Sequence, residues 1–141
     1  MIILDTNLIS ELWKVDPNPG VLTWIDAQAV ETLYLSAITV AELRYGLATM
    51  TEGKRRTIYR TRLEHEVLPI FSGRVLPFDL DASQAYAGLM AGARAAGKTI
   101  GEADGYIAAT AATHRLMVAT RDTRPFEAAG LNTINPWRAS P

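Results

Sequence analysis

Four acidic residues stand where one expected element of the chain gives way to the next. Asp5 directly follows an apolar run at the N-terminus, and Asp122 follows a second apolar run near the C-terminus. Glu42 and Asp104 fall in the early turns of two expected helices. Carboxylates gathered in one site repel each other and raise each other's pKa values unless a cation neutralises them. An all-oxygen ligand set favours Mg²⁺, with Mn²⁺ as a substitute, over zinc or copper.

A magnesium centre of this kind is suited to the hydrolysis of phosphodiesters. The bound cation polarises the phosphoryl group, lowers the pKa of a water molecule and stabilises the leaving oxygen. Neither Asp5 nor Asp104 has a Lys or Arg nearby in the sequence to balance its charge. The alternative is that each acid only caps a helix, because Asp and Glu are favoured in first helical turns. Whether the four acids converge therefore depends on the fold.

Short apolar runs alternate with helical patterns along the whole chain. Strands are expected at residues 2–4, 33–35, 75–78, 116–119 and 133–134. Alternating strands and helices predict an α/β fold, a three-layer α/β/α sandwich around a short central, mostly parallel sheet of four or five strands. The carboxyl ends of parallel strands lie along one edge of the sheet, where ligands bind. All four acids are expected at that edge.

Several helix boundaries carry their own signals. Ser36 is expected to cap one helix, which is interrupted at Gly53 before a new helical face continues up to Pro69. Asp81 with Gln84 has the spacing of a capping box. A further, alanine-rich helix is expected to open at 102 and to run to about 115.

Length and composition narrow the classes of protein that remain. A chain of 141 residues with 48% hydrophobic and 21% charged residues predicts one ordinary globular domain, over residues 1–141. The absence of cysteine excludes a disulfide scaffold, a thiolate zinc site and a cysteine nucleophile. No run is long enough to suggest a membrane span, and the N-terminus lacks the basic region of a signal peptide, so a cytoplasmic location is expected. The net charge of −1 hides a basic middle segment within an otherwise acidic chain.

Four sequence blocks resemble the signature blocks of PIN-domain ribonucleases. They are Leu4-Asp5-Thr6-Asn7, Ala41-Glu42-Leu43, the stretch 103–111 (ADGYIAATA) and Thr120-Arg121-Asp122-Thr123. Their order and spacing are most similar to VapC-type toxins of bacterial toxin–antitoxin modules. The stretch 36–43 (SAITVAEL) and the C-terminal Asn135-Pro136-Trp137 look more like the FitB branch of that family.

The resemblance implies a PIN fold and a Mg²⁺-dependent endoribonuclease that hydrolyses RNA with a metal-activated water. It implies that Asp5, Glu42, Asp104 and Asp122 are the catalytic, metal-binding acids. It further implies that Thr6, Asn7 and Thr120 orient ligands or water. The implied partners are RNA as substrate, a second copy of the chain in a homodimer, and a VapB/FitA-like antitoxin. DNA is reached only through the antitoxin, in a higher assembly, and no membrane is involved.

One position departs from the family pattern. Many VapC-type members have Asn where Asp122 stands and an acid three residues later, where this chain has Pro125. The departure leaves open whether Asp122 is a direct ligand and whether one metal ion binds or two. Glu102 is a spare acid near the same site and is interpreted as a helix cap.

A basic segment is the second candidate site. Its charged residues are Lys54, Arg55, Arg56, Arg60 and Arg62. They either follow the RNA backbone or form a solvated helix face, in which Arg62 pairs with Glu66. Tyr59 is expected to pack, as are Trp13 and Trp24, whereas Trp137 is expected to dock on the body or on a partner. His65 and His114 are interpreted as surface or helix-end residues.

Two other interpretations of these acids place the chain in different classes of protein. A phosphatase or receiver that forms a phospho-aspartate disagrees with Asn7, which stands where such a phosphatase needs a second Asp, and with the basic segment, which lies where a receiver needs its acceptor. A non-catalytic PIN-like module that acts through its antitoxin and DNA complex remains open. Metal binding by the acids distinguishes it from the enzyme.

Overall fold

The protein, described over residues 1–138 by a computed structural model, is built around one five-stranded sheet. Its strands are β1 (Ile2–Leu4), β2 (Leu33–Ser36), β3 (Val75–Leu76), β4 (Met117–Ala119) and β5 (Thr133–Ile134). The strand order is β3-β2-β1-β4-β5, and all four strand pairings are parallel. The predicted α/β class and its parallel central sheet are confirmed.

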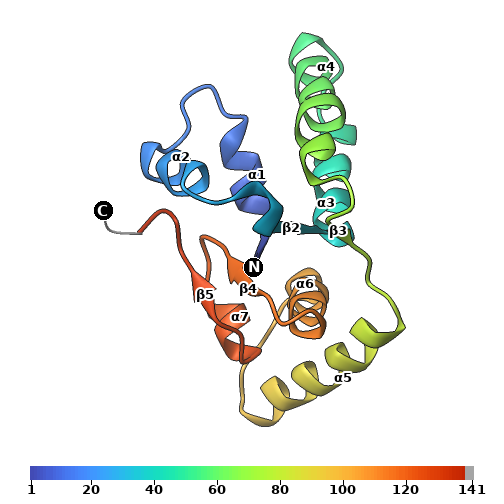
Figure 1. Ribbon diagram of the computed structural model, residues 1–141. Coiled ribbons are helices and arrows are strands. Elements are labelled where there is room, and N and C mark those ends of the chain that lie inside the picture. Colours follow the sequence, from blue (N-terminus) through green and yellow to red (C-terminus); the bar gives the residue numbers. More distant parts are fainter. Residues whose placement is uncertain (139–141) are drawn as a thin grey trace.

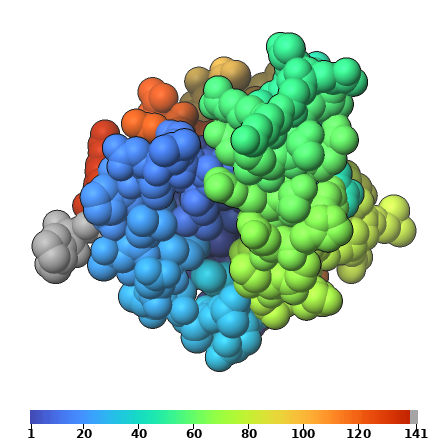
Figure 2. Space-filling view, turned by 90° about the horizontal axis from the view of Figure 1, so that it is seen from above, coloured from blue at the N-terminus to red at the C-terminus, as the bar shows by residue number. Residues whose placement is uncertain are grey.

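Helices cover both faces of this sheet (Figure 1). They are α1 (Thr6–Leu12), α2 (Pro19–Asp26), α3 (Ala37–Ala48), α4 (Lys54–Thr61), α5 (Leu80–Ala95), α6 (Glu102–Thr113) and α7 (Arg124–Ala128). Helices α1 to α4 stand on one side, and α5 to α7 on the other (Figure 1). Figure 2 shows the first side from above, with the blue N-terminal helices beside the green segment that contains α4. This arrangement is the predicted three-layer sandwich.

The strands form two cores because successive side chains point to opposite faces of the sheet. Leu4 of β1 and Ala119 of β4 pack in one core, whereas Ile3 and Val118 pack in the other. The first core contains buried side chains of α1, α2 and α3, such as Leu8, Val21 and Leu43. The second contains side chains of α6 and α7, such as Ile107 and Phe126. Burial on both faces explains why the strands are nearly continuous apolar runs.

The topology places the candidate acids at the carboxyl edge of the sheet. From β1 the chain builds outward through β2 and β3 on one side, while β4 and β5 lie on the other. The strand order thus reverses between β1 and β4, which is where ligands bind in open α/β sheets. Asp5 follows β1 and Asp122 follows β4, so these two acids flank that switch point.

Two helix starts differ from the sequence-based expectation. The capping box of Asp81 and Gln84 is wrong, because Asp79 caps α5 and its carboxylate accepts the Ala82 N–H at 3.0 Å. Glu102 is not a cap either: the N-cap of α6 is Gly101, and the Glu102 carboxylate accepts the Tyr106 hydroxyl at 2.6 Å. Both errors arise because an acid near a helix start has several donors within reach.

The helical stretch that follows Gly53 is not one regular helix. After α4 the chain passes through a π-helical turn, Arg62–Val67, and a 3₁₀ turn, Leu68–Phe71. Pro69 lacks a backbone N–H, so regular helical bonding ends there. A separate 3₁₀ turn at Val30–Thr32 and the five-residue helix α7 were not expected from the sequence. No helix among the described residues is long and apolar enough to cross a membrane.

Candidate functional site

Asp5 occupies the junction between β1 and α1, and it is only 7% exposed. It is the N-cap residue of α1: its Oδ1 accepts the backbone N–H of Thr6 at 2.8 Å. Its Oδ2 accepts the Thr120 hydroxyl at 2.7 Å. Burial raises the pKa of Asp5 above its ordinary value, although these two hydrogen bonds and the charges of Glu42 and Asp122 modify the shift. The side chain is therefore held in one orientation while its charge stays poorly compensated.

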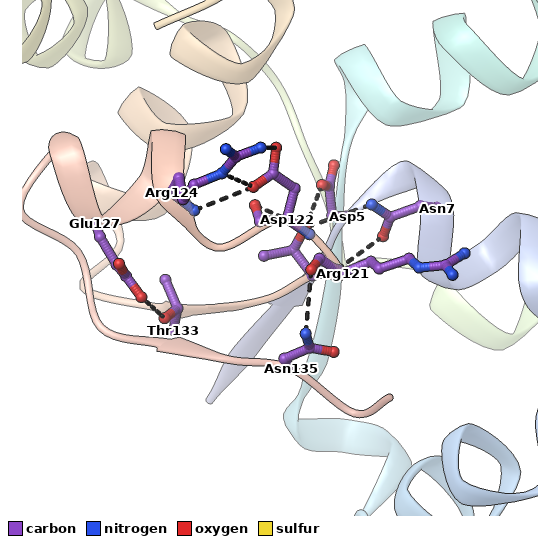
Figure 3. A network of polar contacts seen from close by, with 9 residues as sticks. Asp5, Asn7, Arg121, Asp122, Arg124, Glu127, Thr133 and Asn135 are labelled. Carbon is purple, nitrogen blue, oxygen red and sulfur yellow. Dashed lines mark hydrogen bonds and ion pairs between the residues drawn. The ribbon is translucent and has the colours of Figure 1, made fainter. Parts of the chain in front are cut away.

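Thr120 joins the end of β4 to the start of α1. Its buried hydroxyl donates to Asp5 and accepts the Asp122 N–H at 3.2 Å and the Asn7 side-chain amide at 3.4 Å. Figure 3 shows Asp5, Asn7 and Asp122 gathered around this point. Thr6, Asn7 and Thr120 are the polar residues expected to orient ligands. In the structure Thr6 donates to Glu42, Thr120 donates to Asp5, and Asn7 donates to Thr120, so together they orient the acids.

Glu42 lies on α3, the helix that follows β2, and its side chain reaches the same site from there. Its Oε1 accepts the Thr6 hydroxyl at 2.7 Å, and the hydroxyls of Thr6 and the buried Thr39 lie 3.2 Å apart. The residue is exposed, so its carboxylate is open to solvent and to ligands. Thr39 was not predicted, although it stands one helical turn before Glu42 on the same helix face.

Asp104 lies in the first turn of α6 and is half-buried. Burial, followed by the charges of Asp5, Glu42 and Asp122, raises the pKa of Asp104 to about 6. Within residues 1–138 its carboxylate accepts no side-chain hydrogen bond and takes part in no ion pair. A carboxylate with this raised pKa and no donor is the group that a bound cation would stabilise most.

Asp122 differs from the other three acids. Its Oδ1 lies 3.0 Å from Nε of Arg124, and its Oδ2 accepts Nη2 of the same residue at 3.4 Å. These bonds lower the pKa of Asp122 (Figure 3). Arg124 was not singled out from the sequence, although an arginine two residues from an acid is a common partner. Among the four acids, Asp122 alone has a cationic partner within the described residues.

The structure brings three of the four acids to one hollow of about 430 Å³. Asp5, Glu42 and Asp104 line it, together with Thr6 and Asn7. An adjoining hollow of about 570 Å³ is lined by Asp104, Asp122 and Arg124. Asp104 therefore links the two, and all four acids lie along one surface. As they stand, no three acidic or histidine side chains among the described residues are close enough to hold one ion.

The chemistry of the hollow nevertheless fits a divalent cation. Its carboxylates and hydroxyls are oxygen donors of the kind that Mg²⁺ and Mn²⁺ prefer. Among residues 1–138, no Lys, Arg or His forms an ion pair with Asp5, Glu42 or Asp104. Three acids that share a hollow without a protein counter-charge leave a charge that a metal ion would balance.

The basic segment is divided rather than forming one rail. Arg62 does not pair with Glu66, as the solvated-face interpretation required: its Nη1 donates to the Trp13 carbonyl at 3.0 Å. Arg56 lies 3.8 Å from Glu52. Arg55 lies over the Tyr59 ring, 5.4 Å from its centroid, and Lys54 and Arg60 are exposed. Arg56 and Arg62 thus have partners within the protein, so only some of the five charges of this segment are available to an RNA backbone.

The aromatic residues pack as predicted. The rings of Trp13 and Tyr59 stack at 6.0 Å between centroids, and Trp24 packs against the first core. Trp137 docks on the body of the protein, against that same core and beneath Arg121. Both histidines are exposed, and His114 is the C-cap residue of α6.

Residues 2–131 match the PIN domain family, and the chain therefore belongs to the PIN-domain proteins. It is 73% identical over 137 residues to VapC ribonuclease Y4jK of Sinorhizobium fredii, a match that covers 97% of this chain and 98% of that protein. It is 52% identical over 137 residues to toxin FitB of Neisseria gonorrhoeae, covering 97% and 99% of the two chains.

Solved structures give the same relationship. The chain superimposes on the structure of FitAB bound to an IR36 DNA fragment with a TM-score of 0.96 and 48% identity, covering 99% of this chain and 98% of that chain. The resemblance to PIN-domain toxins of the VapC and FitB type, drawn from four sequence blocks, is confirmed.

Proposed function

We propose that this protein is a metal-dependent endoribonuclease and the toxin of a toxin–antitoxin module. The observation that carries the proposal is the pair formed by Asp5 and Asp104, which line one hollow without a cationic partner among the described residues. Burial raises the pKa of both carboxyl groups. The similarity of this chain to VapC ribonuclease Y4jK supports a nuclease rather than another metal-dependent activity.

Each acid has a role that follows from its environment. Asp5 and Asp104 are the residues that would hold Mg²⁺ or Mn²⁺, with Asp5 fixed by Thr6 and Thr120 before the ion arrives. Glu42 is open to solvent and either joins the metal site or orients a water molecule. When bound, the ion supplies positive charge beside the phosphoryl group and lowers the pKa of water. Asp122 completes the site when Arg124 releases it.

The polar neighbours hold this site together. Thr6 connects Asp5 to Glu42 through its backbone N–H and its hydroxyl. Asn7 and Thr120 connect the start of α1 to the end of β4. Because these bonds connect elements far apart in the sequence, they hold the acids that follow β1 and β4, and the acid on α3, in fixed relative positions while the substrate phosphate approaches.

We further propose that the toxin forms a homodimer and is neutralised by a small antitoxin of the FitA or VapB kind. The proposal is supported by the superposition of this chain on a structure of FitAB bound to an IR36 DNA fragment. In the proposed assembly DNA is contacted by the antitoxin.

Cleavage and metal binding test the proposed function together. Asp5→Asn and Asp104→Asn are expected to lose RNA cleavage in Mg²⁺ and to lose growth arrest when expressed in bacteria. Calorimetric titration with Mn²⁺ is expected to show binding to the native protein and little to either variant. Asp26→Asn is the matched control. It removes the same charge, and Asp26 is exposed at the end of α2.

The outcomes separate the enzyme from the alternative of a non-catalytic binding module. If Asp5→Asn and Asp104→Asn still cleave RNA, the assignment of these residues is wrong. If the native protein and both variants give equal Mn²⁺ heats, the acids serve only to bind a partner.

A further inference from the structure

A cation–π pair stands at the rim of the hollow that contains the acids. The guanidinium carbon of Arg121 lies 5.5 Å from the centroid of the Trp137 ring, and both residues line this hollow with Asp5, Glu42 and Asp104. A cation within about 6 Å of an aromatic centroid is attracted to the ring face. The sequence blocks contain both residues, but the roles derived so far use neither.

One side chain fixes the backbones of both members of this pair. Asn135, just after β5, donates from its amide to the Arg121 carbonyl at 3.1 Å and accepts the Trp137 N–H at 2.9 Å. On the other side, the Arg121 N–H donates to the Asn7 amide oxygen at 3.4 Å. The backbone of Arg121 is therefore hydrogen-bonded to a residue just after β5 and to a residue of α1, which fixes the point from which its side chain extends.

The charge of Arg121 is left available to a ligand. The other cation that lines this hollow, Lys14, is paired with the buried Glu11 at 3.0 Å. Arg121 is exposed and forms no ion pair within residues 1–138, although three acids line the same hollow. In Figure 3 its side chain extends past Asn7 and away from the Asp122–Arg124 pair.

A polyanion that enters this hollow needs such a cation. A phosphodiester beside three carboxylates is repelled, and a metal ion offsets this only where the ion itself binds. A guanidinium presents planar, paired donors that match phosphate oxygens, and stacking on a ring holds that plane in a defined place. An unpaired arginine supported at the rim meets both requirements.

We propose that Arg121 binds a backbone phosphate of the RNA next to the cleaved bond, and that Trp137 is the positioning residue that holds it there. This proposal rests on the proposed ribonuclease function and adds to it a substrate-binding position outside the four acids. It assigns to the C-terminal segment, which follows the last strand, a part in substrate binding.

RNA binding without cleavage tests the proposal directly. All variants are made in the Asp104→Asn background, and binding of a fluorescein-labelled, 20-nucleotide RNA of mixed sequence is followed by anisotropy at several NaCl concentrations. Arg121→Gln is expected to weaken binding about tenfold and to reduce the slope of log affinity against log salt by roughly 0.7 to 1, because one phosphate contact is lost.

Arg115→Gln is the matched control. It removes the same charge from the loop between α6 and β4, at the opposite edge of the sheet from the acids. This control is expected to change RNA affinity less than twofold. If Arg121→Gln and Arg115→Gln give equal affinities and equal salt slopes, Arg121 does not bind RNA and the proposal is overturned.

The Trp137 variants distinguish positioning from simple packing. Trp137→Leu removes the ring but keeps the arginine, so binding is expected to weaken about threefold with little change in the salt slope. Trp137→Phe is expected to restore most of the affinity, because a ring face remains. Equal losses for Phe and Leu, in proportion to a lowered melting temperature, would assign the ring to stability alone.

A separate readout keeps this proposal distinct from the ribonuclease proposal. In the otherwise native protein, Arg121→Gln is expected to raise KM for RNA while Mn²⁺ affinity does not fall. RNA cleavage that survives Asp5→Asn contradicts the proposed function. RNA that is cleaved and bound normally by Arg121→Gln contradicts only the inference about Arg121.

Discussion

The Thr120 hydroxyl donates to Oδ2 of Asp5 across 2.7 Å, and this buried contact joins the ends of two adjacent parallel strands. It is the shortest hydrogen bond between the first and the last of the sequence blocks that carry the candidate acids. Burial, and after it the charges of Glu42 and Asp122, raise the pKa of Asp5, whereas the hydrogen bonds from the Thr120 hydroxyl and the Thr6 N–H lower it and so stabilise the buried carboxylate. The same two donors fix the direction of its oxygens.

Thr120→Val is therefore expected to destabilise the protein by about 1–3 kcal/mol, because it leaves a buried carboxylate oxygen without its donor. The pKa of Asp5 should rise further, and Mn²⁺ affinity near neutral pH should fall. Urea denaturation measures the first effect and calorimetric titration the second. Thr120→Ser keeps the hydroxyl and should resemble the native protein in both. Equal behaviour of Val and Ser would show that the bond contributes nothing to the site.

Asp104 predicts a specific pH dependence of stability. Its pKa is raised from 3.8 to about 6, so between these values the folded protein binds a proton that the unfolded chain has released. The contribution of this group to stability is greatest below pH 3.8 and declines as pH rises to about 6. In EDTA at pH 7.5, Asp104→Asn is expected to be more stable than the native protein by about 1 kcal/mol, less than the full shift implies because solvent screens the group.

Denaturation from pH 4 to pH 8 checks this expectation. The two proteins should differ little at pH 4, where Asp104 is largely protonated and resembles Asn in shape. Added Mn²⁺ should reverse the order at pH 7.5, since the ion stabilises only a protein that binds it. A constant difference across the range would mean that Asp104 titrates normally.

Two glycines in neighbouring helices give opposite predictions for one substitution. A Cβ at Gly105 of α6 would lie 2.8 Å from Met90 Sδ and 3.0 Å from a Tyr86 ring carbon, whereas a Cβ at Gly88 of α5 meets nothing within 4 Å. Gly105→Ala is expected to lower the free energy of unfolding by about 1–2 kcal/mol through overpacking. Gly88→Ala is expected to raise it by about 0.5–1 kcal/mol through helix propensity.

Urea denaturation of the two variants measures this difference under identical conditions. If both variants gain stability, the side chains of Met90 and Tyr86 yield to the added methyl group, and the close approach of α5 to Gly105 does not limit packing.

The sequence predicts those features that depend on neighbours along the chain. The apolar run before Asp5 defines a buried strand, and the polar residues after it define the strand end, so both the sheet and the edge that carries the acid follow from local pattern. Ser36 caps α3 as predicted, because its hydroxyl needs only the Ile38 N–H two residues on. The alternation of such units is enough to give the parallel sheet.

Features that depend on which distant groups meet could not be predicted in this way. Arg62 has a helical partner four residues on in Glu66, but its side chain donates instead to the carbonyl of Trp13, the C-cap residue of α1, 49 positions away in the sequence. The Arg121–Trp137 pair needs β4 and β5 to be adjacent before their following residues can meet. Asp79 and Asp81 have the same side chain, and only the backbone conformation at residue 79 decides which of them caps α5.

Arg124 and Asp122 give the last prediction, which concerns the fourth acid. Their ion pair is exposed to solvent, so Arg124→Gln should leave the stability of the protein nearly unchanged. The substitution removes the main cause that lowers the pKa of Asp122 and frees both of its oxygens. If Asp122 binds the metal ion, Mn²⁺ affinity should rise several-fold by calorimetry, and Asp122→Asn should abolish that gain.

Lys98→Gln is the control, because Lys98 lines the same hollow as Arg124 and Asp122 but forms no ion pair with Asp122 in the described part of the chain. Any loss of positive charge near the acids favours a cation to some extent, and this variant measures that general effect. A larger gain for Arg124→Gln means that the arginine and the ion compete for the same carboxylate. Equal gains mean that Asp122 lies outside the metal site, and that Asp5, Glu42 and Asp104 hold the ion without it.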